Sequence, residues 1–343
     1  MGSVVRGVAA ADDRGDLARV RCGGAGRRRE PRPGRFPISL ADVLAVLLGR
    51  GDRTQQLIVL ELRLPRTLTG VLVGAALGVS GAITQALTRN PLASPDILGV
   101  TAGAGAAAVL VIVLGGRGGA LGAILAGIGL PIVALIGGLV TAALVYALAY
   151  RRGIEGYRLV LVGVGIGAVA TAITSWLLVI ANIFDVGRAT VWLTGSLDDR
   201  GWEHVGPVGL AVVVLVPIAL LLAFGLGALQ FGDDTARGLG IRVNRARSVL
   251  ILVAVGLAAV ATSSAGPIAF VALVVPQICQ RLVRAARPPL LASAVYGALL
   301  TVMADLIART ALGRELPVGI VTAVLGAPYL LYLLARRNRG VIA

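Results

Sequence analysis

The 343-residue sequence contains no lysine, one histidine and two cysteines, and charged residues make up only 14% of it. Without lysine, the chain cannot form the G-x-x-x-x-G-K-[ST] loop that cradles nucleotide phosphates, so any nucleotide-driven step falls to a partner. Cys22, Cys279 and His204 are too few and too scattered for a metal site, a disulfide framework or a Cys/His nucleophile pair. We expect packing or surface roles for these three residues.

What the sequence has instead is long apolar runs: hydrophobic residues make up 57% of the chain, and its mean hydropathy is +0.89. Uncharged stretches, most of them near or above the ~20 residues that span a bilayer, lie at 67–88, 97–116, 118–150, 159–184, 205–232, 248–280, 288–304 and 316–335. The run 248–280 is too long for one helix, and the Gly-Pro step in Ser263–Ile268 divides it. The runs are continuously apolar, which argues against a β-barrel. The sequence therefore predicts an all-α polytopic membrane protein with nine transmembrane helices.

The chain has 47 glycines, and Gly70, Gly74, Gly78 and Gly81 recur along one predicted helix. Small residues at this spacing let helix backbones approach closely. A tightly packed bundle and a substrate path lined by small side chains both fit this pattern.

The net charge of +15 comes from arginines that flank the apolar runs, so we interpret it as a topology signal rather than as a nucleic-acid surface. With alternating spans, the loops on one side hold twice as many arginines as the loops on the other. The arginine-rich side, which includes Leu229–Arg247, is expected to be cytoplasmic.

The first 36 residues are rich in arginine and contain no apolar run, which predicts a disordered tail. Residues 38–48 are apolar but too short to cross a bilayer, so we expect a short surface or interfacial helix there. Nine spans would place this tail and the other chain end on opposite sides, against the charge rule. Either the tail stays inside by an unusual arrangement, or an N-terminal helix is missing.

The segment Leu229–Arg247, "LQFGDDTARGLGIRVNRAR", is a polar island between apolar runs. Asp233 and Asp234 suit a helix N-terminus, and Gly238 or Gly240 suits its end. The pattern predicts one or two helical turns and a bend, which could push on a partner. A plain solvated loop is the alternative.

Several motifs together resemble one family. They are "NPLASPDILG" within Leu60–Ala106, "GSLDDRGW", the polar island, "AGPIAFVALVVPQ", "ADLIARTAL" and "ELPVGIVTAVLGAPYLLYLL". These resemble the permease subunits of bacterial ABC importers for iron-siderophore complexes and cobalamin over residues 38–338, with the ferric-enterobactin (catecholate) branch the most similar. The resemblance implies a permease domain at 37–338 that works without a cofactor of its own.

The resemblance also implies partners and sites. Two ATP-binding subunits, which use ATP and Mg, would contact the coupling helices at 229–247 through Gly232, Asp233, Asp234, Ala236, Arg237, Leu239 and Gly240. A periplasmic or lipoprotein siderophore-binding protein would dock its glutamates on Arg63, Arg66 and Arg309, and a second permease subunit would complete the pair. A gate or cytoplasmic loop would include Asn90, Pro91, Asp96, Glu155 and Gly156. The implied location is the cytoplasmic (inner) membrane.

Spacing alone adds two further expectations. Asp305 and Arg309 lie four residues apart and can pair along one helix face. Pro91 and Pro95 forbid a continuous helix there, so we expect a rigid cytoplasmic turn after which Asp96 caps the next helix.

The chain departs from the family pattern in three places. The usual ten spanning helices are reduced to nine, and the first one is predicted to be missing. "GFVGL" reads "AFVAL" at Ala269–Leu273, and Gln277 stands where histidine is common.

The resulting hypothesis is a permease that carries out no bond chemistry and passes a ferric siderophore inward. A cobalamin or haem permease of the same family is one alternative. An ion-coupled secondary transporter would need several intramembrane acids, and Asp305 is the only acid within a predicted span. A structural membrane scaffold would need no coupling helix.

Overall fold

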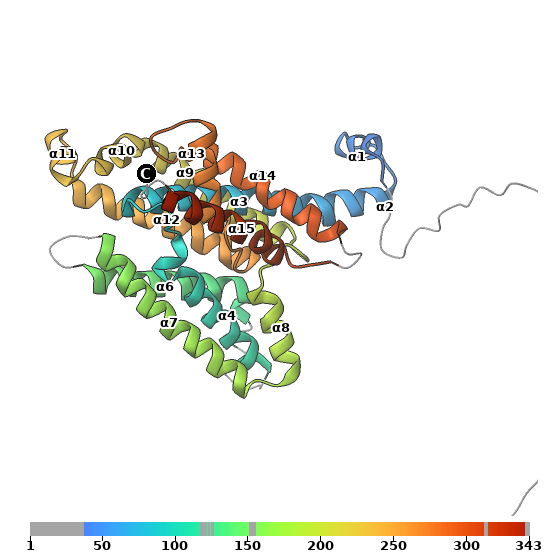
Figure 1. Ribbon diagram of the computed structural model, residues 1–343. Helices are drawn as coiled ribbons and strands as arrows, with labels where there is room; N and C mark the ends of the chain where they lie inside the picture. Colours follow the sequence, from blue (N-terminus) through green and yellow to red (C-terminus); the bar gives the residue numbers. More distant parts are fainter. Residues whose placement is uncertain are drawn as a thin grey trace, which may run out of the picture.

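The computed structural model describes residues 38–116, 122, 124, 127–150, 156–311 and 315–339, and every element found there is helical (Figure 1). The predicted tail at 1–36 lies outside these residues. Six helical stretches are long and apolar enough to cross a membrane: Arg53–Thr88, α6 (Leu130–Ala149), α7 (Gly156–Ile180), α9 (Trp202–Leu221), α12 (Val243–Ala265) and α14 (Leu290–Thr310). Three shorter apolar helices are α4 (Val100–Gly116), α13 (Val271–Leu282) and α15 (Val318–Arg339).

Each of the nine predicted spans contains one of these helices, so the all-α polytopic fold is confirmed. The helix α13 nevertheless has only 12 residues. At 1.5 Å per residue it is about 18 Å long, whereas a bilayer core is about 30 Å thick. The chain returns from α12 through the irregular segment 266–270 before α13 begins, and Gly266 adopts φ +73° at the predicted break.

The helix α3 (Leu64–Thr88) forms the centre of the bundle and packs against α14, α12, α13 and α9. A methyl group added at Gly74 would overlap the carbonyl oxygen of Gly297, and one added at Gly78 would overlap that of Ser293. Of the two interpretations of the glycine spacing, close helix packing is therefore correct for Gly74 and Gly78. They face α14 rather than a substrate path.

A second group of helices, α4, α6, α7 and α8, lies beside this centre (Figure 1). The helix α12 contacts both α6 and α4 and so joins the two groups. The helix α8 (Ile183–Leu193) was not predicted, because Asp185 and Arg188 interrupt the apolar pattern. Its start is fixed by Asn182, whose side chain accepts a hydrogen bond from the Asp185 amide at 2.9 Å.

The first described helix, α1 (Leu40–Leu47), confirms the short helix expected at 38–48, and Ser39 and Asp42 cap it reciprocally. The next stretch combines α2 (Arg53–Gln56), the π-helix η1 (Leu57–Arg63) and α3 into one helical run. The predicted start at residue 67 was wrong because Arg63 and Arg66 interrupt the apolar run without interrupting the helix. In η1 the indole nitrogen of Trp202 donates a hydrogen bond to the Leu60 carbonyl at 3.1 Å.

The predicted run 205–232 is also divided. The helix α9 ends at Leu221, and α10 (Ala223–Gln230) follows after a bend at Leu222. The guanidinium of Arg287 donates to the Ala223 carbonyl at 3.1 Å and so pairs a backbone group at this bend.

Candidate functional sites at the two ends of the bundle

At one end of the bundle, the polar island folds as the sequence predicted. The helix α11 (Asp233–Gly238) begins with the two aspartates, and the chain turns at Gly240, where φ is +79°. The turn leads into α12. Gly232 precedes α11 with φ +114°, a region that glycine adopts without a steric penalty. We call this end of the molecule the Asp233 end.

The carboxylate of Asp233 points into the protein. Its Oδ1 lies 2.8 Å from Nη2 of Arg247, and its Oδ2 lies 3.4 Å from Nη1 of the same guanidinium. Arg89, which ends α3, contributes a longer ion pair at 3.5 Å and donates to the Leu229 carbonyl at 2.7 Å. Asp233 thus connects α11 to the ends of α3 and α12.

The next aspartate points the other way. The side chain of Asp234 is 99% exposed, and it pairs with Arg237 on the same helix at 2.7 Å. Leu239 is also exposed, whereas Ala236 is fully buried against the bundle. The outward face of α11 therefore offers Asp234, Arg237 and Leu239 to a partner.

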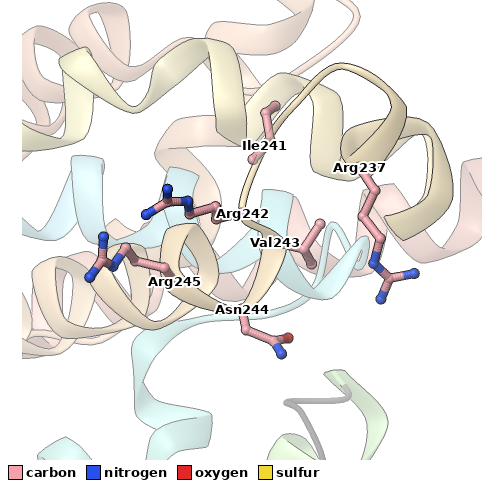
Figure 2. A pocket seen from close by; sticks show the side chains of 6 residues that line it. All are labelled: Arg237, Ile241, Arg242, Val243, Asn244 and Arg245. Atoms are coloured by element: carbon pink, nitrogen blue, oxygen red, sulfur yellow. The ribbon is translucent and has the colours of Figure 1, made fainter.

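Beside α11 a basic depression of about 370 Å³ opens between α11 and the first turn of α12 (Figure 2). The side chains of Arg242 and Arg245 are exposed there. The lining residues are Arg237, Ile241, Arg242, Val243, Asn244 and Arg245. The exposed guanidinium groups give this surface a positive charge that attracts acidic groups.

The predicted gate residues divide between three places. Gly156 shares a cavity of about 350 Å³ with Asp233, Arg89 and Arg247, so the structure brings it to the Asp233 end. Asn90 and Pro91 directly follow α3, where the Asn90 side chain accepts from the Leu92 amide at 3.0 Å. Asp96 belongs to the 3-10 helix η2 (Pro95–Leu98), away from this cavity. Glu155 lies outside the described residues.

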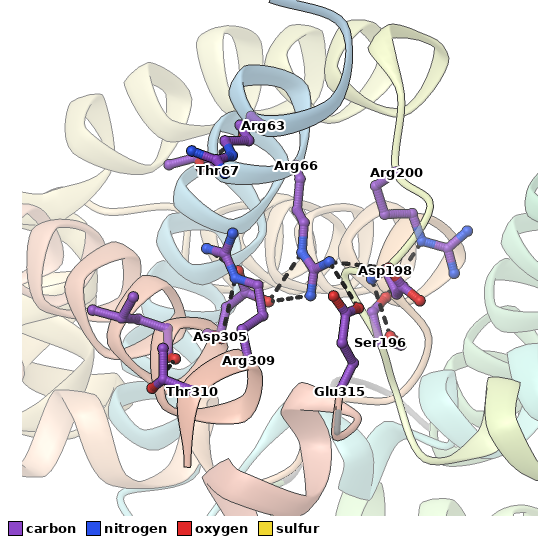
Figure 3. A network of polar contacts seen from close by, with 11 residues as sticks. Arg63, Arg66, Thr67, Ser196, Asp198, Arg200, Asp305, Arg309, Thr310 and Glu315 are labelled. Carbon is purple, nitrogen blue, oxygen red and sulfur yellow. Dashed lines mark hydrogen bonds and ion pairs between the residues drawn. The ribbon is translucent and has the colours of Figure 1, made fainter. Parts of the chain in front are cut away.

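At the opposite end, Arg66 forms a network with three carboxylates (Figure 3). Its Nη2 lies 2.9 Å from Oδ1 of Asp305, and its Nη1 lies 3.0 Å from Asp198 and 3.3 Å from Glu315. The network joins α3 and α14 to the segments before α9 and before α15. We call this the Arg66 end.

The expected pair of Asp305 and Arg309 is confirmed, with Nη2 to Oδ2 at 2.8 Å. The sequence did not reveal that Asp305 also binds Arg66, since the two residues are 239 positions apart. Asp305 is almost fully buried, so its two arginine partners compensate the cost of holding a charge there.

The three arginines predicted as a docking surface are not equally accessible. Arg66 is only 9% exposed and uses its guanidinium inside the protein, whereas Arg63 and Arg309 are half-buried. Nearby, burial lowers the pKa of Arg200 from its ordinary value, and the carboxylates of Asp199, Asp198 and Glu203 oppose that shift. Arg200 nevertheless stays protonated, because arginine does not lose its proton in proteins.

Within the described residues, no group of three or more His, Cys, Asp or Glu side chains is arranged to hold a metal ion. The chemical groups that the two ends do offer are ion-pairing side chains and short helices. Such an arrangement suits contact with other proteins.

Comparison with protein families gives a match over most of the chain: the model of the FecCD transport family matches residues 33–336. The ferric enterobactin transport system permease protein FepG of Escherichia coli (strain K12) is 42% identical over 309 residues, which are 90% of this chain and 91% of that protein. The probable siderophore transport system permease protein YfhA of Bacillus subtilis (strain 168) is 40% identical and covers 87% and 88% of the two chains.

The vitamin B12 import system permease protein BtuC of Yersinia enterocolitica is 38% identical, over 83% of this chain and 84% of that protein. Among solved structures, an inward-facing metal-chelate type ABC transporter superimposes with a TM-score of 0.75 at 30% identity. The match covers 83% of this chain and 89% of that one.

Proposed function

The chain belongs to the FecCD transport family, and from that premise we propose that it passes a ferric siderophore of the enterobactin type across the cytoplasmic membrane. It is a multi-pass permease component of an importer of the siderophore or metal-chelate type. The single observation that supports the enterobactin-type substrate is the 42% identity to FepG over nine-tenths of both chains.

The Asp233 end would receive the two ATP-binding subunits. Its short helix α11 projects an exposed face formed by Asp234, Arg237 and Leu239, while Gly232 and Gly240 permit the turns on either side. Closure of the ATP-binding subunits around ATP and Mg would push on this helix. Coupling of this kind requires a two-state element that both sites bias, and the ion pairs of Asp233 give α11 a direct mechanical connection to α3 and α12.

The Arg66 end would dock a periplasmic or lipoprotein siderophore-binding protein. Arginine suits this because its planar guanidinium can hold a carboxylate with two hydrogen bonds. Arg63 and Arg309 can contact incoming glutamates directly. At Arg66 such a glutamate would compete with Asp198 and Glu315, whose side chains are 60% and 55% exposed.

A second permease subunit, identical or different, would complete the membrane pair. Many large apolar side chains face outward from the described helices, among them Trp176, Val213 and Leu299. In a membrane such side chains contact lipid or a neighbouring subunit.

The proposal is tested by reconstituting the chain with its ATP-binding subunits and binding protein in proteoliposomes. We expect ATP-dependent uptake of radioactive iron presented as ferric enterobactin. The same vesicles are assayed with cobalamin and haem, because a vitamin B12 permease is also among the relatives. Uptake of cobalamin or haem without uptake of ferric enterobactin would replace the proposed substrate with one of these.

A further inference from the structure

A separate cavity of about 360 Å³ is lined by residues of η2, α4, α7 and α8 and by Pro267. Its polar lining residues are Asp96, Thr101, Thr171 and Thr174, and its remaining lining residues are Ala102, Gly105, Leu193 and Pro267. The sequence placed Asp96 in a turn at the cytoplasmic surface. The packing of the residues that follow Asp96 places this segment deep in the bundle instead.

The segment that carries Asp96 lies deep in the bundle. A methyl group added at Gly99 would lie 2.9 Å from the Thr141 side chain, and Thr141 is eleven residues after the start of α6 and eight before its end. At 1.5 Å per residue, Thr141 is therefore more than about 10 Å from either end of α6. The carbonyl of Ile97 likewise touches Gly163, seven residues inside α7. The chain re-enters the bundle after α3, and α4 begins near the middle of α6.

Irregular backbone at this depth exists only where it is buried in protein or lines a water-filled space, because lipid cannot pair its polar groups. Asp96 itself is exposed. It accepts hydrogen bonds from the hydroxyls of Ser94, at 3.1 Å, and of Thr101. No cationic side chain in the described part of the chain forms an ion pair with it. An exposed carboxylate without a cation is very costly in hydrocarbon, so this side of the cavity must meet water.

The polar groups of the cavity share one property: they accept hydrogen bonds. Thr171 and Thr174 donate their hydroxyl protons to the carbonyls of Gly167 and Ala170, at 2.9 Å and 3.0 Å. Thr101 donates its proton to Asp96. Only oxygen lone pairs and one negative charge remain for a ligand. The cavity therefore favours groups that donate hydrogen bonds and disfavours groups that carry negative charge.

We propose that Asp96, Thr101, Thr171 and Thr174 line the water-filled substrate path, and that the Asp96 carboxylate determines which chelate charge passes. This inference rests on the proposed function and adds a specificity residue to it. Hydroxyl and amide groups on the rim of a ferric chelate would bind these acceptors. The negative charge keeps a polyanionic chelate from resting there.

The first experiment tests the path without any substrate. In a background with Cys22→Ser and Cys279→Ala, Asp96→Cys and Thr174→Cys are labelled with a membrane-impermeant thiol reagent. Val169→Cys is the matched control, because Val169 is exposed and apolar on the opposite face of α7. Thiols react as hydrated thiolates, so both cavity positions should be labelled at least about tenfold faster than position 169. Equal rates in complexes that still assemble would overturn the water-filled path.

The second experiment tests the charge preference. Asp96→Asn and Asp96→Glu are compared in uptake of a trianionic ferric catecholate and an uncharged ferric hydroxamate. We expect Asp96→Asn to raise the catecholate-to-hydroxamate ratio on the order of fivefold, as loss of a single nearby charge would. Asp96→Glu should keep the native ratio. An unchanged ratio in Asp96→Asn would overturn the specificity role. Failure of the unaltered protein to import any ferric chelate would instead overturn the proposed function. The labelling experiment would still show whether the cavity is filled with water.

Discussion

Asp233 and Asp234 are neighbours in the sequence but occupy different surroundings. Asp233 binds Arg247, a side chain that is only 12% exposed, while Asp234 is in open solvent. A family motif identifies the pair of aspartates but does not say which faces inward. That distinction depends on where α3 ends and where α12 begins.

Replacing Asp233 by Asn should uncouple transport while leaving assembly intact. The change removes the charge that holds Arg247 and Arg89 and should cost about 1 kcal/mol of stability. Binding of the ATP-binding subunits is measured by co-purification, and coupling is measured as iron imported per ATP hydrolysed. We expect normal co-purification and a severalfold lower ratio. A normal ratio would show that Asp233 does not transmit the motion.

Asp234→Asn is the matched control for Asp233→Asn. An exposed pair such as Asp234 and Arg237 contributes about 0.5 kcal/mol or less. This variant should keep its thermal stability and weaken co-purification instead, since the exposed face of α11 that carries Asp234 is the one proposed to receive the ATP-binding subunits.

Arg66 provides the second prediction at this scale. Arg66→Ala removes one of the two cations that bind the buried Asp305 and should lower the unfolding free energy by about 3 kcal/mol. The measurement is thermal unfolding of the purified chain in detergent. Asp198→Asn and Glu315→Gln change the exposed partners of Arg66 and should cost less than about 1 kcal/mol each. A mild effect of Arg66→Ala would show that Arg309 alone satisfies Asp305.

At the level of elements, α3 and α14 cross closely, because the backbones meet at glycines. Gly78→Ala would place a methyl group on the Ser293 carbonyl and should cost about 1–3 kcal/mol. Gly165 on α7 has open space around it, so Gly165→Ala should be neutral or stabilising by about 0.5–1 kcal/mol. Thermal unfolding of the two variants checks both values. Equal stability would mean that α14 moves away freely.

Apolar runs predicted where the helices lie but not how they begin. Charged residues ended the predicted runs, and α2, η1 and α8 were missed because helices at membrane ends tolerate charge. The prolines at 91 and 95 showed correctly that α3 cannot continue. The prolines do not show how deep in the bundle the next segment lies. Only its packing against α6 and α7 shows that the chain re-enters the bundle at Gly99.

At the level of the whole molecule, the sequence pattern of the polar island predicted the short helix α11 and the turn after it, because the residues that form them are adjacent in the chain. The network of Arg66, Asp198, Asp305 and Glu315 could not be predicted, since its members come from segments far apart in the sequence. Which helix faces meet lipid and which meet water also follows only from the assembled bundle.

The whole complex offers one further prediction. Replacing residues 232–240 by a Gly-Ser segment of equal length should abolish ATP-driven uptake and co-purification of the ATP-binding subunits. The membrane bundle should keep its helical circular dichroism, because only Ala236 in that segment is buried. Retained pumping would show that energy enters elsewhere. The same nine-residue replacement within 40–48 provides a control for disturbing a short peripheral helix.

The wide turn of η1 affects the orientation of α1 and α2 relative to α3. A π-helix takes more residues per turn than an α-helix, so the residue count of Leu57–Arg63 sets the azimuth at which α1 and α2 stand relative to α3. Deleting one residue of η1 should rotate α1 around the shared axis by less than the ~100° of one α-helical residue, because a π-helix turns less per residue. Everything after Arg66 would keep its orientation, as would any surface recognised there.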